Sequence, residues 1–68
     1  MSVINLREEF IKLGQALKAA DLVESGAEAK DEIISGKVKV NGSVETQRGK
    51  KLYSGDKVEY KGQMIEIK

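Results

Sequence analysis

The chain lacks cysteine, histidine and proline altogether, and its aromatic residues are limited to one phenylalanine and two tyrosines. Without cysteine it can form neither a disulfide nor a thiolate metal site. Without histidine it lacks the usual imidazole ligand and the side chain best suited to proton transfer near neutral pH. These absences exclude a thiol nucleophile, a histidine-dependent hydrolytic triad and a conventional zinc site. We therefore expect neither a metal nor a cofactor.

Long apolar runs are absent as well. No stretch approaches the length of a membrane span, and residues 1–7 lack the charged and then apolar pattern of a secretory signal. The sequence also contains neither Gly-x-x-x-x-Gly-Lys-Ser/Thr nor Gly-x-Gly-x-x-Gly, the glycine-rich loops that hold nucleotide phosphates. We expect a cytoplasmic protein that contacts no membrane and is not an enzyme, with residues 1–68 forming one small domain.

What the sequence does contain is an uneven distribution of charge. The formal net charge is only +1, yet residues 36–51 hold five cations and a single anion, Glu45. Residues 1–36, in contrast, hold four cations and seven anions. A localised cationic patch on a small domain is typical of proteins that bind polyanions. On charge alone, a solvated charged face is an equally good interpretation.

The hydrophobic periodicity predicts two short helices. Phe10, Leu13, Leu17 and Ala20 follow the spacing of an amphipathic helix. Gly14 weakens a helix by about 1 kcal/mol relative to alanine, so we expect the regular part to begin near Leu13. A short connection then leads into the second helix.

The second helix has the clearest local signal. Ser25 and Glu28 form the pattern of a capping box, in which the hydroxyl and the carboxylate each accept a free backbone N–H. We expect this helix to bury Ile33 together with Ile34, and to end at Gly36, which suits the position just after a helix.

From residue 37 the period becomes two, with lysines on one face and valines on the other, and Asn41 and Gly42 supply a turn. A plain two-residue turn would place Val44 on the lysine face. We therefore predict a three-residue loop or a bulge that pairs Val40 with Val44.

Both ends of the chain also read as strands. Residues 2–6 resemble a short edge strand. Near the other end, Val58 and Tyr60 precede a turn at residues 61–62, and we expect Val58 to pair with Ile65 and Tyr60 with Gln63.

Several motifs together resemble a known family. Phe10 to Lys18, Ser25 to Lys30, the run Gly-Lys-Val-Lys-Val-Asn-Gly, and Arg48 to Leu52 follow one another in this order. They resemble the RNA-binding domain named after the fourth protein of the small ribosomal subunit, often called the alpha-L motif. The similarity is greatest to its small stand-alone bacterial members of the YaaA/YbcJ type. The resemblance implies an α+β fold, a two-helix corner packed on a small, mostly antiparallel sheet of short strands and hairpins.

The resemblance also implies a function and a set of contacts. In this family the helix corner and the adjoining basic hairpin grip structured RNA, so we expect ribosomal RNA or tRNA as the partner, with an association with the ribosome. The matching RNA-binding positions are Lys12, Lys18, Ser25, Lys30, Lys37, Lys39, Asn41, Arg48, Lys50 and Lys51. Since A-form RNA hides its major groove, such a surface reads shape, phosphates and 2′-hydroxyls. Arg48 is the best candidate for a bidentate phosphate or base-edge contact.

The chain departs from the family at two glycines. Many members carry an aspartate where this chain has Gly14, and an arginine where it has Gly26. We expect the first change to remove a cap and the second to remove a phosphate contact. Both glycines are similar to the stand-alone members, whose Arg-Gly-Lys-Lys loop compensates.

Some of these residues have a second interpretation. Asn41 is what a tight turn requires in any protein, and Lys30 is equally an exposed helical lysine paired with neighbouring carboxylates. A protein–protein adaptor also stays open as the function, through an acidic helix face formed by Glu24, Glu28, Asp31 and Glu32. Nothing exposed and apolar in the sequence demands a dimer, so we expect a monomer.

Overall fold

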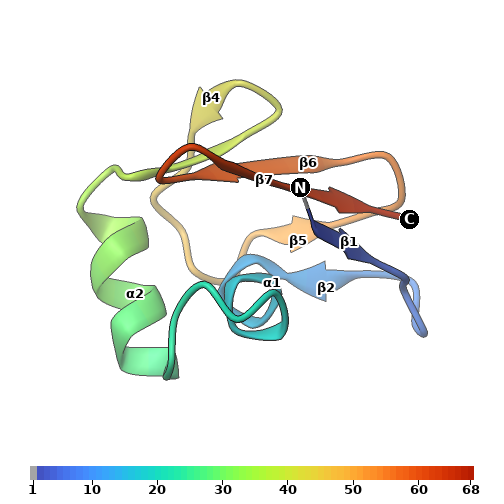
Figure 1. The fold of residues 1–68 in the computed structure, drawn as a ribbon, viewed down its shortest axis with the longest axis horizontal. Coiled ribbons are helices and arrows are strands. Elements are labelled where there is room, and N and C mark those ends of the chain that lie inside the picture. Colours follow the sequence, from blue (N-terminus) through green and yellow to red (C-terminus); the bar gives the residue numbers. More distant parts are fainter. Residues whose placement is uncertain (1) are drawn as a thin grey trace.

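The computed structural model describes residues 2–68, which form two helices and two sheets (Figure 1). The elements are β1 (Ser2–Ile4), β2 (Ile11–Lys12), α1 (Leu13–Ala19), α2 (Gly26–Ile34), β3 (Val38–Val40), β4 (Ser43–Val44), β5 (Lys51–Leu52), β6 (Lys57–Tyr60) and β7 (Gln63–Ile67). The main sheet has the strand order β1-β7-β6-β3-β4, and β2 pairs with β5 separately. Only the β1–β7 pair is parallel. The predicted α+β fold is confirmed.

The two helices lie together on one side of the main sheet in Figure 1. Neither of these helices, the only ones within residues 2–68, is long and apolar enough to cross a membrane. The β2–β5 pair lies beside α1. The segment that enters α1 therefore runs next to the segment that follows the basic loop, residues 48–50. This pairing brings the two halves of the chain together at the start of the first helix.

α1 begins at Leu13, as the sequence predicts. Leu13 and Leu17 are completely buried, which follows from their helical spacing on one face. Phe10, however, does not belong to this helix, because residues 11–12 are extended and form β2. Its side chain is half-buried outside the central core.

α2 begins with the predicted serine cap, although its second half differs. Ser25 Oγ accepts the N–H of Glu28 at 3.1 Å, whereas the Glu28 carboxylate accepts the N–H of Glu24 at 2.7 Å rather than that of Ser25. Ile33 is buried, but Ile34 is 56% exposed, so the prediction that both are buried is wrong. Successive helical residues point about 100° apart, and only one of the two can face the core.

The end of α2 follows from its glycine. Gly36 has φ +79° and donates its N–H to the carbonyl oxygen of Ile33 (3.1 Å), while Lys37 donates to that of Glu32 (3.3 Å). These two bonds form a Schellman motif, which satisfies carbonyl groups that the helix leaves free. The predicted helix end at Gly36 is confirmed.

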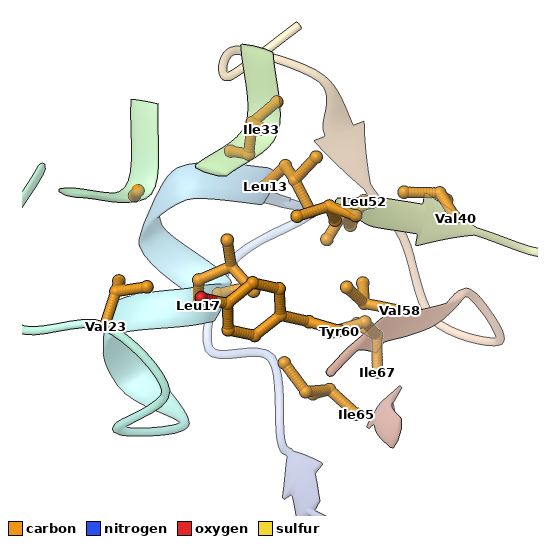
Figure 2. Close-up of a cluster of buried hydrophobic side chains, with 13 residues drawn as sticks. Leu13, Leu17, Val23, Ile33, Val40, Leu52, Val58, Tyr60, Ile65 and Ile67 are labelled. Atoms are coloured by element: carbon orange, nitrogen blue, oxygen red, sulfur yellow. The ribbon is translucent and has the colours of Figure 1, made fainter. Parts of the chain in front are cut away.

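The core is formed by side chains from both helices and from strands of both sheets, converging as Figure 2 shows. Its completely buried large residues are Leu13, Leu17, Ile33, Val38, Leu52, Val58, Ile65 and Ile67. Tyr60 joins them with only 3% of its surface exposed. All side chains of the core cluster are apolar except for the Tyr60 hydroxyl, so burial is the main source of stability.

The β3–β4 hairpin differs from the sequence prediction. Val40 pairs with Ser43 and Lys39 with Val44, so Asn41 and Gly42 form a plain two-residue turn. Both turn residues have positive φ values, +51° and +87°, as a type I′ turn requires. The predicted longer loop is therefore wrong, and Val44 stays 54% exposed on the lysine face. The turn decided the register, because the bonds from the Asn41 amide to Lys57 and Asp56 hold residues 41–42 in this conformation.

The β6–β7 hairpin matches the prediction. Val58 pairs with Ile65 and Tyr60 with Gln63. Val58, Tyr60, Ile65 and Ile67 are buried on one face of this hairpin, so a register shift of one residue would move them to solvent. The predicted edge strand is also confirmed, since β1 lies at the edge of the main sheet, although it ends at Ile4.

Candidate nucleic-acid interface

The loop before β5 is anchored to the start of α1 through its backbone. The N–H of Leu13 donates to the carbonyl oxygen of Lys50 at 2.8 Å, and the N–H of Gly14 donates to that of Arg48 at 3.1 Å. Both N–H groups belong to the first turn of the helix, where no intrahelical acceptor exists. The loop carbonyls thus cap α1 and hold residues 48–50 against it.

Gly14 is buried directly beneath the side chain of Arg48. A Cβ on Gly14 would lie 2.8 Å from Arg48 Cγ and 3.3 Å from Cδ. The first of these separations is shorter than carbon atoms tolerate, so the arginine can hold this position only over a glycine. The missing side chain at Gly14 therefore supplies room for Arg48, while loop carbonyls provide the helix cap.

A cleft of about 320 Å³ lies between α1, this loop and the start of α2; we call it the helix-loop cleft. It is lined by Lys12, Gly14, Gln15, Lys18, Gly26, Arg48 and Gly49. Three of these side chains are cationic and none is anionic. Lys12, Lys18 and Arg48, expected from the sequence as separate contacts, are brought together here. Such a lining attracts an anionic ligand.

The beginning of α2 forms one side of the helix-loop cleft. Ser25 is occupied as the cap of this helix, which gives the predicted contact a structural role. The first intrahelical bond runs from the Ala29 N–H to the Ser25 carbonyl oxygen. The N–H of Gly26 lies before this bond and therefore has no acceptor within the helix. A Cβ on Gly26 would meet no atom within 4 Å. The second departure from the family thus leaves open space at the cleft.

Lys12 and Lys51 stand directly opposite each other in the β2–β5 pair. Like charges in this arrangement repel each other and destabilise the pairing. Neither lysine forms an ion pair within residues 2–68, where Glu32 is the anion of every ion pair present. Lys51 Nζ instead lies 4.8 Å from the centroid of the Phe10 ring, in a cation–π contact. A bound polyanion would relieve the remaining repulsion.

A second hollow of about 390 Å³ lies beside the β3–β4 hairpin; we call it the hairpin hollow. It is lined by Val40, Asn41, Ser43, Glu45, Lys50, Lys51, Tyr53 and Asp56. The predicted contacts Lys50 and Lys51 lie here, but together with two carboxylates. This hollow is therefore less uniformly cationic than the helix-loop cleft.

Asn41 holds the hairpin hollow together rather than presenting a free amide. Its Oδ1 accepts the N–H of Lys57 at 2.9 Å, and its Nδ2 donates to Asp56 Oδ1 at 3.0 Å. Asp56 Oδ2 also accepts the N–H of Tyr53 at 2.8 Å. The Tyr53 N–H and then the Asn41 amide hold the pKa of the Asp56 carboxyl below its ordinary value. These bonds explain the turn geometry at Asn41.

The remaining predicted lysines lie outside both hollows. Lys30 is exposed on α2, and it forms no ion pair within residues 2–68. Lys39 is exposed on β3 with Glu59 opposite it on β6. Lys37 precedes β3 and its Nζ lies 3.2 Å from Glu32 Oε2. The structure thus separates these three lysines from the concentrated charge around Arg48.

Glu32 is the centre of a polar cluster on α2. It accepts the hydroxyl hydrogen of Tyr60 at 2.6 Å and lies 3.2 Å and 3.5 Å from the ammonium groups of Lys37 and Lys61. The Tyr60 hydrogen bond, followed by Lys37, lowers the pKa of the Glu32 carboxyl, and the same hydrogen bond raises the pKa of Tyr60. Glu32 therefore connects α2 to the main sheet, and its carboxylate is engaged by the Tyr60 hydroxyl and two lysine ammonium groups of the same protein.

Sequence reasoning missed Gln15. This residue lines the helix-loop cleft, and its position three residues from both Lys12 and Lys18 places it on the same helix face. That spacing could have identified it. Tyr53 keeps 44% of its surface exposed beside the hairpin hollow.

Comparison with known proteins gives consistent results. The sequence model of the S4 domain family matches residues 4–68. A protein of Bacillus subtilis (strain 168) named "Probable ribosome maturation protein RlbA" is 46% identical over 59 residues, which cover 87% of this chain and 83% of that protein. A protein of Escherichia coli (strain K12) named "Putative RNA-binding protein YbcJ" is 39% identical over 61 residues, covering 90% of this chain and 87% of that protein.

Proposed function

The chain belongs to the S4 domain family, and from this premise we propose that it is a non-catalytic protein that binds structured RNA. The observation that carries the proposal is the helix-loop cleft, whose lining contains Lys12, Lys18 and Arg48 and no carboxylate. Lys50 and Lys51 extend the cationic surface towards the β3–β4 hairpin. The names of the two relatives, one an RNA-binding protein and the other a ribosome maturation protein, agree with this function.

The rigidity of the surface favours a structured RNA over a flexible strand. Backbone hydrogen bonds fix residues 48–50 to α1, so the Cα positions that carry Arg48 and Lys50 keep a constant distance from the helix. A fixed set of cations matches the regular phosphates of an A-form helix, whose deep major groove is closed to side chains. Arg48 would bind a phosphate through two parallel N–H groups, and the lysines would act as point charges.

Ribosomal RNA and tRNA are the structured RNAs that we propose as partners, with ribosomal RNA favoured by the name of the Bacillus subtilis relative. We further propose that the protein acts as a monomer in the cytoplasm and associates with the ribosome. Lys30, Lys37 and Lys39 would then contribute at the margin of the contact, since they lie outside the two hollows.

The adaptor alternative receives less support. Of the four carboxylates on the proposed acidic face, Glu28 accepts the N–H of Glu24, and Glu32 is engaged by Tyr60, Lys37 and Lys61. Only two carboxylates, those of Glu24 and Asp31, are left without such contacts on that face. No observation favours a basic protein partner over RNA.

The test is binding of the purified protein to structured ribosomal RNA fragments and to tRNA across a salt series, measured by fluorescence anisotropy. We expect micromolar or tighter binding whose logarithm falls linearly with the logarithm of salt concentration. The triple variant Arg48→Ala/Lys50→Ala/Lys51→Ala should bind more weakly. Its salt slope should be lower by about one for each cation that touches a phosphate in the wild-type complex.

A matched variant removes the same amount of charge elsewhere. Arg7→Ala/Lys57→Ala/Lys68→Ala changes three exposed cations that line neither hollow. It should retain most of the affinity and nearly the whole salt slope. Equal losses in the two triple variants would reduce the interaction to non-specific attraction, and the absence of binding at low salt would overturn the proposed function.

A further inference from the structure

The hairpin hollow contains an exposed aromatic side chain that the phosphate contacts do not use. Among the three aromatic residues, Tyr60 is buried and Phe10 is half-buried, whereas Tyr53 keeps 44% of its surface exposed. A tyrosine ring offers a flat apolar face, so an exposed ring can stack on another flat ring. Its exposure beside two lysines is therefore informative.

Tyr53 is held in place by its backbone and by its ring. Asp56 Oδ2 accepts its N–H at 2.8 Å, and the N–H of Asp56 donates to its carbonyl oxygen at 3.0 Å. The Tyr53 ring lies 6.1 Å from the ring of Phe10, centroid to centroid, at 53°. This tilted pair supports the exposed ring from within the protein. Tyr53 thus presents a fixed surface that loses little conformational freedom on binding.

Each member of this aromatic pair has a lysine nearby. Lys51 Nζ is placed above Phe10, and Lys50 joins Tyr53 in the lining of the hairpin hollow. Ser43 contributes a hydroxyl to the same lining. The hollow therefore combines an aromatic face, positive charge and a polar group, the set that a nucleotide requires for its base, phosphate and edge. Its two carboxylates, Glu45 and Asp56, accept the backbone N–H groups of Gln47 and Tyr53 within the protein.

We propose that the hairpin hollow binds an unpaired nucleobase, which stacks on Tyr53 while its phosphate contacts Lys50 and Lys51. The inference rests on the proposed RNA-binding function and narrows it to RNA in which a helix adjoins a bulge, a loop or an end. Bases inside a helix have both faces covered by neighbouring pairs, so a base in the interior of a helix can lie against an aromatic ring only after it leaves its pair. The cations of the helix-loop cleft contact the phosphates of the duplex, and the hairpin hollow holds the base that leaves it.

The experiment uses two blunt-ended RNA stems without loops, which differ at one position. One carries a single bulged 2-aminopurine in its stem, and the other has the same stem fully paired. Binding of both is measured for the wild-type protein, for Tyr53→Phe, which keeps the ring, and for Tyr53→Leu, which keeps an apolar side chain without a ring. Thermal unfolding verifies that both variants are folded.

We expect the wild-type protein to prefer the bulged RNA and to quench the 2-aminopurine fluorescence, as stacking does. Tyr53→Leu should lose roughly 5- to 100-fold in affinity for the bulged RNA, the range measured when a stacking aromatic is removed, and little for the paired stem. Tyr53→Phe should stay within about threefold of the wild type, because the π-face that stacks is retained.

The outcomes separate this inference from the function on which it rests. Equal affinity of the wild type for both RNAs, with no quenching, would overturn the nucleobase site and leave duplex binding standing. An equal loss for both RNAs in Tyr53→Leu would also overturn it, because it would show a general effect on the surface. Failure of the wild type to bind either RNA would overturn both proposals.

Discussion

The side chain of Arg48 crosses Gly14 so closely that a Cβ on the glycine would stand 2.8 Å from Arg48 Cγ. At the same place the N–H of Gly14 donates to the carbonyl oxygen of Arg48 at 3.1 Å. One residue of a helix and one of a distant loop are thus fitted to each other through both backbone and side chain. The helix-loop cleft depends on this fit.

Replacing Gly14 with alanine should therefore weaken RNA binding without unfolding the protein. The Arg48 side chain would have to turn away from α1, while the helix gains up to about 1 kcal/mol from the removal of a glycine. We expect an affinity loss of roughly tenfold, corresponding to one charge-assisted hydrogen bond of about 1.5 kcal/mol. Anisotropy titrations together with urea unfolding measure the two effects separately.

A double-mutant cycle with Arg48→Ala is the control for that prediction. If Gly14 acts by positioning Arg48, the double variant should bind no more weakly than Arg48→Ala alone. Additive losses would show that Gly14 contributes to binding by another route.

Replacing Gly26 with arginine should strengthen RNA binding. A side chain at this position meets no atom within 4 Å of its Cβ and extends from the edge of the helix-loop cleft. One additional phosphate contact should raise the salt slope by about one and improve the affinity several-fold at low salt. Gly26→Ala is the matched control and should show neither change; an unaltered slope in Gly26→Arg would contradict the position of the cleft on the RNA.

Replacing Tyr60 with phenylalanine should lower stability and leave RNA binding unchanged. The substitution removes the 2.6 Å hydrogen bond to Glu32 but keeps the buried ring. We expect the thermal midpoint to fall by a few degrees, because the Glu32 carboxylate loses its closest partner. Titration with the same RNA checks the second half of the prediction, which a loss of affinity in a fully folded variant would refute.

Stability should decrease in acid, and Asp56 should account for part of the decrease. Its pKa in the folded protein lies below the ordinary value of 3.8, since its carboxylate accepts the Tyr53 N–H and then the Asn41 amide. A group with a lowered folded pKa contributes stability that is complete above its unfolded pKa and is lost as the pH falls through the folded pKa. Glu32, whose pKa is lowered by Tyr60 and Lys37, acts in the same direction.

The variant Asp56→Asn isolates this contribution. It should be less stable than the wild type by about 1 kcal/mol near pH 7, where the charged acceptor is lost. The difference should shrink as the pH falls below 3.8 and then through the lower pKa of the folded protein, because the wild-type carboxyl also becomes neutral. Urea unfolding at several pH values measures the difference directly, and a constant gap across this range would show that the ionised form of Asp56 has no special role.

Local signals in the sequence predicted much of the fold. The serine cap at the start of α2, the glycine that follows its last turn (Gly36) and the alternation in β6 and β7 each depend on neighbouring residues, and each is confirmed. The register of the β3–β4 hairpin was predicted wrongly because two local rules disagreed there. The pattern favoured burial of Val44, and the Asn41–Gly42 turn opposed it; the bonds from Asn41 to Lys57 and Asp56 favoured the turn.

The candidate site was less accessible to sequence reasoning. The cationic residues could be identified by type, but their grouping depends on contacts between distant segments. Lys12 meets Lys51 only because β2 pairs with β5, and Arg48 reaches the start of α1 only because its carbonyl accepts the N–H of Gly14. No local pattern encodes these contacts, since both partners look ordinary in their own segments.

The backbone bonds that tie residues 48–50 to Leu13 and Gly14 also constrain how this protein can change. Shortening or lengthening the loop would withdraw the two carbonyls that complete the first turn of α1, so the loop cannot vary in length as most surface loops do. Adaptation to a different RNA would therefore require substitutions of side chains in the loop, while the backbone path stays the same. The basic loop is therefore, in effect, an extension of the helix scaffold.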